Sequence, residues 1–291
     1  MTFDEAYRRG RDRLKKAGVE SPAFDAVCLF QKAFGMDRQA LIVNGAKQAP
    51  PEQAERFFET VGQRAGRRPL QYILGEWEFM SMKLQVGEGV LIARGETELL
   101  VRTAARLLKG RPSPLCLDLC AGTGAVGLGL SSLLPGARVA CVERFPRALC
   151  YLRRNLKAAA RPGVTALSAD VTDPAAAARF SGVDAVVANP PYVRSDEIAG
   201  LQEEVRREPG SALDGGPDGL DFYRAIAKLW LPRLKAGGVA AVEIGEGQAP
   251  QVCALFRSVG ISEIGVFPDF NRIDRVVAGI RKKEGSGISL S

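Results

Sequence analysis

Apolar stretches of strand length that alternate with helical segments after Pro114 constrain the fold of this chain more than any other feature. Because most of these stretches are apolar throughout, we expect strands that are buried on both faces. The predicted strands are Leu115–Leu119, Arg138–Val142, Val164–Leu167, Val183–Ala188, Gly238–Ile244 and one near Arg275–Gly279, and the predicted helices begin at Ala125, Pro146, Asp218 and Gln248. The pattern predicts an α/β fold in which helices cover both faces of a mostly parallel sheet.

The chain before this region has a different pattern. Residues 1–68 carry helical spacing and no catalytic motif, so we predict a small all-helical N-terminal domain that docks a partner or packs against the larger domain. Residues 69–94 contain the extended stretches PLQYILGEWEF and MKLQV, which predict a β-hairpin linker. We predict that residues 95–282 form the α/β domain, which opens with a helix over Glu96–Leu108, and the composition of residues 283–291 predicts a disordered tail.

The composition excludes several kinds of active site. The 291 residues include no histidine, which rules out imidazole bases and histidine metal sites. The six cysteines show no CxxC spacing, so we expect reduced thiols and no metal ligands. No stretch approaches the ~20 apolar residues that span a bilayer, and the N-terminus is too charged for a signal peptide. The sequence therefore predicts a cytoplasmic protein without a membrane partner.

A glycine-rich turn in the segment LDLCAGTGAVGL joins a predicted strand to a predicted helix. Gly122, Gly124 and Gly127 let the backbone pass close to a ligand, and the helix N-terminus favours a polar or anionic group. By itself this turn also fits a nicotinamide cofactor, or a tight turn without a ligand. Asp118 at the strand end, however, suits a cationic amine. Glu143, which ends the next strand about twenty residues on, suits a ribose diol.

Asp170 and Val171 follow the third predicted strand, at the same edge of the sheet. Asp170 can accept a hydrogen bond from an adenine amino group, and Val171 can pack on the ring. An ordinary turn that ends a strand explains the same two residues equally well.

Asn189-Pro190-Pro191-Tyr192 directly follows the apolar strand Val183–Ala188, at the edge where open α/β sheets bind ligands. The Asn189 side chain and the Pro190 carbonyl are two hydrogen-bond acceptors on one rigid turn, and Tyr192 adds a flat face. These groups suit a planar NH2 group of an amide or an aromatic amine, bound with little loss of entropy. The alternative is a proline-rich strand end with Tyr192 packed beneath it.

The segment Val193–Gly216 has no clear secondary structure and begins directly after this turn. Loops of such length in a compact domain are usually functional. We therefore predict a lid over the site, with a helical turn around Ile198–Val205.

Together these motifs resemble those of the class I S-adenosylmethionine-dependent methyltransferases, and with Asn-Pro-Pro-Tyr the chain resembles the HemK/PrmC family. The resemblance covers nearly the whole chain and implies a Rossmann-like domain with a seven-stranded sheet. Its cofactor would be S-adenosylmethionine. Its reaction would be methylation of the side-chain amide nitrogen of the GGQ glutamine in class 1 peptide-chain release factors. Further matching positions are Pro69, Tyr72, Ile73, Gly75, Phe79, Leu91, Ile92, Arg94, Glu96, Thr97, Glu98, Glu208, Pro209, Ala212, Leu213, Gly215, Gly216, Asp218 to Asp221, Tyr223, Arg224, Glu243 to Gly245, Gln248 and Asp274 to Val276.

Carried over residue by residue, the resemblance implies a site without a metal. The implied cofactor-binding residues are Asp118, Cys120, Ala121, Gly122, Thr123, Gly124, Glu143, Arg144, Asp170, Val171 and Asn189. The implied catalytic and substrate-binding residues are Asn189, Pro190, Pro191 and Tyr192, with Arg94 and Glu96 also on the substrate side. Asn189 and the Pro190 carbonyl would accept from the glutamine amide, and Pro191 and Tyr192 would pack on it.

The chain departs from the family pattern at three places. Ala93 and Gly95 flank Arg94 where the family usually has prolines, Cys120-Ala121 replaces a commoner Gly or Ser followed by a small residue, and Glu143 replaces an Asp. These changes bear on loop order and cofactor affinity, and they leave the reaction class intact.

Three other functions compete with this interpretation. An adenine amino methyltransferase acting on DNA or RNA would present the same NH2 group, and the net charge of +7 fits such a partner. Such enzymes usually carry a recognition domain with aromatic and basic residues, whereas the N-terminal domain here has few aromatic residues and no evident groove, so we expect no direct nucleic-acid partner. A glutamine methyltransferase of a ribosomal protein would use identical chemistry. A non-catalytic nucleotide-binding protein would leave Asn189 to Tyr192 unexplained. We expect a monomer, because the substrate is itself a protein.

Overall fold

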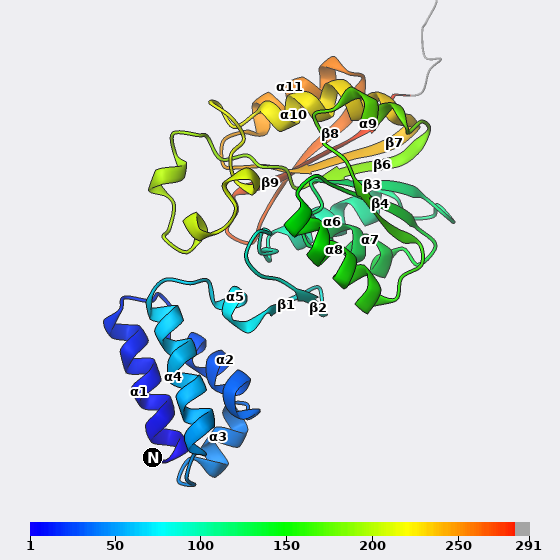
Figure 1. Ribbon diagram of the computed structural model, residues 1–291. Helices are drawn as coiled ribbons and strands as arrows, with labels where there is room; N and C mark the ends of the chain where they lie inside the picture. Colours follow the sequence, from blue (N-terminus) through cyan, green and yellow to red (C-terminus); the bar gives the residue numbers. More distant parts are fainter. Residues whose placement is uncertain (283–291) are drawn as a thin grey trace, which may run out of the picture. The chain divides into compact units, whose positions relative to one another are not determined.

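The computed structural model of the protein describes residues 1–282, which form two compact units (Figure 1). The first unit comprises Met1–Trp77 together with Gln202–Arg207, and the second comprises Glu78–Leu201 and the residues from Glu208 onward. The first unit thus extends past residue 68 and includes a segment of the predicted lid. The tail predicted at residues 283–291 lies outside the described residues.

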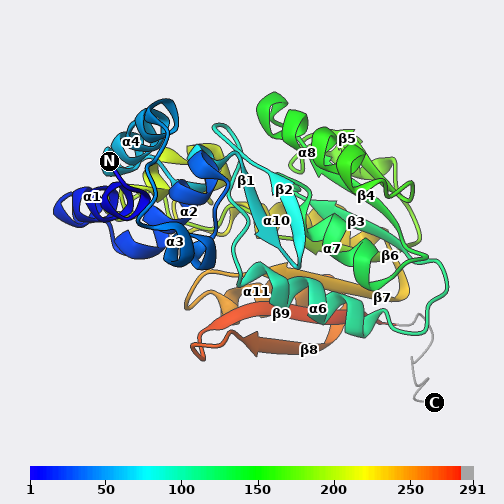
Figure 2. The same cartoon turned by 90° about the horizontal axis from the view of Figure 1, so that it is seen from below.

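The first unit is helical, as its apolar spacing predicts (Figure 2). A capping box between Thr2 and Glu5 starts the first helix. Apolar side chains from the helices share one core, in which Leu14, Phe30 and Phe57 are fully buried. The helices are α1 (Phe3–Lys16), α2 (Pro22–Phe34), α3 (Arg38–Asn44), α4 (Pro51–Ala65) and α5 (Leu70–Leu74).

The helix α5 corrects the prediction of an extended stretch after Pro69. Leu70 and Ile73 lie one helical turn apart, and both are buried in the core of the first unit, which favours a helix over a strand. Gly75, with φ of +79°, ends this helix. The hairpin follows as β1 (Glu76–Phe79) and β2 (Met82–Gln85).

The second unit contains the predicted seven-stranded sheet, with strand order β5-β4-β3-β6-β7-β9-β8. Strands β3 to β7 pair in parallel, and β9 pairs antiparallel with both β7 and β8. The strands are β3 (Leu115–Leu119), β4 (Arg138–Glu143), β5 (Val164–Ser168), β6 (Val183–Ala188), β7 (Leu234–Glu243), β8 (Ile261–Pro268) and β9 (Asp274–Arg281). The residue pattern did not predict β8, an edge strand in which Ile261 alone is fully buried and polar residues separate it from the apolar residues that follow.

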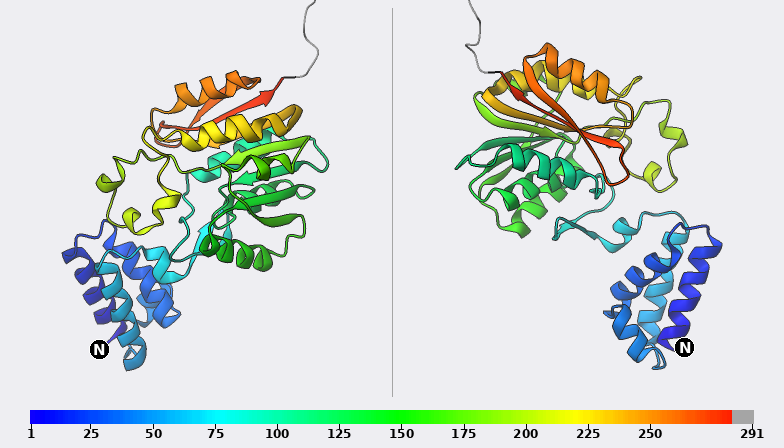
Figure 3. Two further views of the ribbon diagram at one scale, coloured as in Figure 1. Left: turned by 45° about the horizontal axis from the view of Figure 1, so that its top comes forward. Right: turned by 180° about the vertical axis from the view of Figure 1, so that it is seen from behind.

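Helices cover both faces of the sheet, as both views in Figure 3 show. Successive strand residues join different cores: Cys116 packs with the helices on one face, and Leu117 packs with those on the other. One face carries α6 (Thr97–Leu107), α7 (Ala125–Leu133) and α8 (Pro146–Ala159). The other carries α9 (Pro174–Ala178), α10 (Asp221–Ala225), the π-helical Ile226–Trp230 and α11 (Ala249–Ser258). The α10 helix begins at Asp221 and not at Asp218 as predicted, because Gly219 has a φ of +73°, which a right-handed helix does not allow.

The parallel strands end at one edge of the sheet, so the motifs that follow β3, β4, β5 and β6 meet there. The segment Val193–Gly216 contains only short 3-10 turns, at Ile198–Gly200, Val205–Arg207 and Gly210–Ala212. Within the described part of the chain, no helix has the length and apolar character to span a membrane.

Candidate active site

A cavity opens at the carboxyl edge of the sheet. It has about 920 Å³ of space, including its opening to solvent, and all its lining residues belong to the second unit. Most of the predicted cofactor-binding residues meet in it although they come from separate parts of the chain. The predicted residues in the lining are Cys120, Ala121, Gly122, Thr123, Glu143, Arg144, Asp170, Val171, Asn189 and Pro191.

The glycine turn forms one wall of this cavity, and its glycines are needed for different reasons. Gly124 has φ of +84°, and a Cβ there would lie 2.6 Å from Leu152 Cδ1. A Cβ on Gly127 would lie 2.4 Å from Cys141 Sγ, so this glycine lets α7 pack closely on the strand. Cys120 adopts a left-handed φ of +58°, which costs on the order of 1–2 kcal/mol for a residue other than glycine.

Two carboxylates face the cavity from neighbouring strand ends. Both oxygens of Glu143 accept backbone hydrogen bonds, from Gly122 N (2.9 Å) and from Phe145 N (2.7 Å), which hold the carboxylate in place. Asp170 accepts from Thr172 and from the Arg144 guanidinium. Burial raises the pKa of Asp170, but these hydrogen bonds and the charge of Arg144 outweigh burial and leave it below its usual value. The Asp170 carboxylate is therefore ionised at neutral pH and can only accept hydrogen bonds.

Asp118 lies beneath the glycine turn and outside the cavity lining. Its side chain is 1% exposed, and Oδ2 accepts from Gly127 N at 2.9 Å. Burial raises its pKa to about 7. The contact with Gly127 supports the turn, and the predicted role toward a cationic amine stays a prediction.

The Asn-Pro-Pro-Tyr turn lies beside the cavity, with Asn189 and Pro191 in the lining. The Asn189 amide donates from Nδ2 to Thr97 Oγ1 at 3.1 Å. Tyr192 is half-buried, and burial, together with the charge of Glu243, raises its pKa to about 12. Its phenol therefore stays protonated at neutral pH and cannot act as a base.

Gln248, the N-cap residue of α11, contacts the Asn-Pro-Pro-Tyr turn through its side-chain amide. Its Nε2 donates to the carbonyls of Tyr192 (2.9 Å) and Gly219 (3.3 Å). Its Oε1 accepts from Gly245 N (2.9 Å) and lies 3.3 Å from the Tyr223 hydroxyl. One side chain thus joins four segments of the second unit at the active-site edge.

Replacing Gln248 by leucine is expected to lower kcat about 10- to 100-fold, because the turn would lose the hydrogen bond to its Tyr192 carbonyl and shift relative to the cavity. Methyl-transfer kinetics with the protein acceptor measure the loss. The matched control is Gln251→Leu, an exposed glutamine on the same helix, which should keep wild-type kcat. Equal kcat in the two variants would contradict a positioning role for Gln248.

Arg94 and Glu96 lie outside the cavity lining. The Arg94 guanidinium pairs with the buried carboxylate of Glu208, whose other oxygen accepts from Ile92 N at 2.9 Å. Burial raises the pKa of Glu208, and Arg94 opposes the rise. Since Pro209, the next residue, lines the cavity, this pair supports the cavity wall. Glu96 is exposed at the start of α6.

Glu243, the last residue of β7, is a buried carboxyl near Tyr192. Burial raises its pKa to about 7, although hydrogen bonding by Thr97 and Tyr192 and the charge of Arg275 oppose the rise. Its Oε2 has no hydrogen-bond partner among the described residues.

Glu243→Gln is expected to raise Tm relative to wild type by an amount that grows from about pH 5 to about pH 8. The folded protein holds the Glu243 proton more tightly than the unfolded chain does, so wild type loses stability as the pH rises from 4.5 through about 7. Glutamine has no proton to lose there. Thermal unfolding at several pH values checks this, and identical pH dependence in both proteins would refute it.

Sequence reasoning did not single out many of the lining residues, because most are apolar and lie outside the motifs. Thr97 and Leu91 lie in segments that match the family pattern, and Phe145 directly follows Arg144. Their position near predicted site residues was the signal that could have identified them. Leu91, Thr97, Pro209 and Ala212 are matching positions for which no role in the site was predicted. The other lining residues without a predicted role are Gly89, Val90, Ala93, Ala125, Val126, Val142, Phe145, Ala148, Ala169, Ser211 and Phe222.

Family models match two parts of the chain. The model described as "PrmC N-terminal domain" matches residues 5–75, and the model described as "Methyltransferase small domain" matches residues 95–214. Among solved structures, the hMettl16 catalytic domain in complex with the MAT2A 3'UTR hairpin 6 is 15% identical, with a TM-score of 0.54. The alignment covers 78% of this chain and 83% of that chain. At this identity the likeness concerns the fold alone.

Whole-chain relatives are more similar. A release factor glutamine methyltransferase of Geobacter sulfurreducens is 40% identical, over 92% of this chain and 93% of that protein. One of Moorella thermoacetica is 38% identical, over 98% of this chain and 100% of that protein. The chain therefore belongs to the release factor glutamine methyltransferase family.

Proposed function

We propose that the protein transfers a methyl group from S-adenosylmethionine to the side-chain amide nitrogen of the GGQ glutamine in class 1 release factors. The names of its relatives support the reaction and the kind of substrate. The observation in the structure that carries the proposal is the position of the Asn-Pro-Pro-Tyr turn, whose residues Asn189 and Pro191 line the same cavity as the glycine turn.

The residues present fit S-adenosylmethionine. The backbone of the glycine turn passes along the cavity, and the Glu143 carboxylate, held by two backbone N–H groups, can accept from ribose hydroxyls. Asp170 can accept from the adenine amino group, with Val171 and Phe145 as apolar walls. When bound, the cofactor would supply a methyl group on positively charged sulfur. Asn189, which also lines the cavity, would face the substrate amide.

The substrate amide is a poor nucleophile, because its nitrogen lone pair is delocalised into the carbonyl. The carboxylates in the cavity lining are committed to hydrogen bonds, and the Tyr192 phenol stays protonated. We therefore assign the residues a role in positioning. Asn189 Oδ1 and the Pro190 carbonyl would accept from the two amide N–H groups and stabilise the positive charge that grows on nitrogen as its bond to the methyl carbon forms and the bond from that carbon to sulfur breaks, which leaves a neutral thioether. The nitrogen would then release one proton to solvent. Alignment of this kind contributes roughly 7–11 kcal/mol.

Transfer of labelled methyl from S-adenosylmethionine to a purified class 1 release factor tests the proposal, run beside a factor whose GGQ glutamine is replaced by alanine. Label on the normal factor and none on the variant would support reaction, substrate and site together. Absence of label on both, with cofactor binding intact, would defeat the proposal and direct the assay to ribosomal proteins and then to nucleic acids.

We further propose that the protein acts as a monomer in the cytoplasm, where release factors work. A monomer is expected because the proposed substrate is itself a protein. Sedimentation of the purified protein at assay concentration tests this, and activity confined to a dimer fraction would contradict it.

A further inference from the structure

We propose that Thr97 and Glu243 are positioning residues that set the orientation of the Asn189 side-chain amide. Neither residue would touch the reacting atoms. The inference rests on the proposed function, because it concerns the Asn189 oxygen that would accept from the substrate glutamine.

The first step is the contact between Asn189 and Thr97. Asn189 Nδ2 donates to Thr97 Oγ1 at 3.1 Å, and Thr97, at 3% exposed, is the first residue of α6. A side-chain amide has a donor side and an acceptor side. When Nδ2 faces Thr97, the acceptor Oδ1 is free for a substrate N–H group. In the opposite orientation, the NH2 group of Asn189 would face the NH2 group of the substrate glutamine, and no hydrogen bond could form between them.

The second step concerns the proton of the Thr97 hydroxyl. A hydroxyl that accepts from Asn189 still has one proton to donate. The carboxyl of Glu243 is 1% exposed and lies near enough to the Thr97 side chain for Thr97 to lower its pKa. Its Oε2 has no partner in residues 1–282, so the carboxyl has capacity to accept. Donation from the Thr97 hydroxyl to Glu243 would complete a directed chain from Asn189 through Thr97, in which Glu243 is the final acceptor.

Protonation of Glu243 would reverse this chain. A protonated carboxyl donates to Thr97, the Thr97 proton then points to Asn189, and the Asn189 amide turns its NH2 group toward the cavity. The charged and titratable groups that face Glu243 are Glu96 from α6, Arg275 from β9, Tyr192 from the turn and Tyr223 from α10. Burial and the charge of Glu243 keep the Tyr192 phenol protonated, and Tyr223 donates to the Glu243 main-chain carbonyl. The Glu243 carboxyl, with a pKa of about 7, is thus the group suited to switch the chain near neutral pH.

The test measures kcat and KM for methylation of a class 1 release factor between about pH 6 and pH 8.5. Thr97→Val keeps the shape of the side chain but removes its hydroxyl group. Thr97→Ser keeps the hydroxyl group and removes only the methyl group. Thr103→Val is the matched control, because Thr103 is a buried threonine on the same helix outside the cavity lining. Calorimetry with S-adenosylhomocysteine checks the cofactor site of each variant.

Thr97→Val should lower kcat about tenfold, the size expected for one lost orienting hydrogen bond, with cofactor affinity unchanged. Thr97→Ser should recover most of the rate, and Thr103→Val should match wild type. Wild-type kcat should fall as the pH drops through about 7, and Glu243→Gln should stay at the low rate without that inflection.

Wild-type kcat in Thr97→Val, or a wild-type pH inflection in Glu243→Gln, would overturn the inference while the proposed function stands. If Thr97→Val does not fold, the pH profile of kcat in Glu243→Gln is the measurement that tests the inference. A wild-type protein that labels no release factor would defeat the proposed function, and this inference with it.

Discussion

Asn189→Ala is expected to lower kcat by at least about a hundredfold, while affinity for S-adenosylmethionine stays close to wild type. The substitution removes the side-chain acceptor for the substrate amide and the contact with Thr97, and it leaves the glycine turn and the hydrogen bonds of Glu143 intact. Steady-state kinetics with a class 1 release factor measure kcat, and calorimetry measures cofactor affinity.

The matched control is Asn271→Ala, an exposed asparagine in the turn between β8 and β9 and outside the cavity lining. It should keep wild-type kcat. Turnover by Asn189→Ala within about twofold of this control would refute the acceptor role. A loss of cofactor affinity as large as the loss of kcat would instead place the main role of Asn189 at the cofactor.

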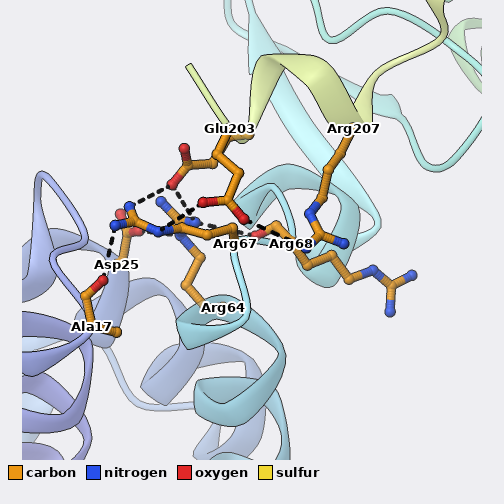
Figure 4. A network of polar contacts seen from close by, with 8 residues as sticks. Ala17, Asp25, Arg64, Arg67, Arg68, Glu203 and Arg207 are labelled. Carbon is orange, nitrogen blue, oxygen red and sulfur yellow. Dashed lines mark hydrogen bonds and ion pairs between the residues drawn. The ribbon is translucent and has the colours of Figure 1, made fainter. Parts of the chain in front are cut away.

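Arg64→Ala is expected to destabilise the protein by about 3–5 kcal/mol, because it breaks a buried ion pair in the first unit. Arg64 Nε lies 2.6 Å from Asp25 Oδ2, and the side chains of both residues are only 8% exposed. The guanidinium also lies 2.9 Å from Glu204 Oε1 and donates to the Arg68 carbonyl (Figure 4). Without Arg64, the Asp25 carboxylate would remain buried and uncompensated.

Chemical denaturation followed by circular dichroism measures this loss. The control is Arg56→Ala on the same helix α4, whose pair with Glu52 is exposed and should contribute less than about 1 kcal/mol. Burial already raises the pKa of Asp25, and Arg64 opposes the rise, so removing Arg64 would raise that pKa further. The difference in the free energy of unfolding between wild type and Arg64→Ala should therefore decrease as the pH falls and Asp25 takes up a proton. A deficit equal to that of Arg56→Ala would contradict the prediction.

The same pairs explain where part of the predicted lid lies. Glu204 accepts from Arg64 and from Arg67, which places Gln202–Arg207 in the first unit. Glu208, the next residue, returns to the second unit and pairs with Arg94. No apolar period marks this segment, so the sequence indicated a loop without indicating its contacts.

Local patterns in the sequence determined the architecture and most of the cofactor side of the site. Strands β3 to β7 are mostly apolar, and each polar or glycine motif lies at or just after the end of a strand, so chain order alone predicts that these motifs meet at one edge. Where a local pattern was weak or ambiguous, as in α5 and β8, the prediction failed.

Only the tertiary structure decided how the functional side chains are held. The contacts from Asn189 to Thr97, from Gln248 to Tyr192 and from Arg64 to Glu204 join residues 92, 56 and 140 positions apart. Asp118 is a strand-end acid like Glu143, yet it lies under the glycine turn instead of in the cavity lining. The physical reason is that a buried polar group requires a partner, and the folded packing brings that partner from a distant part of the chain.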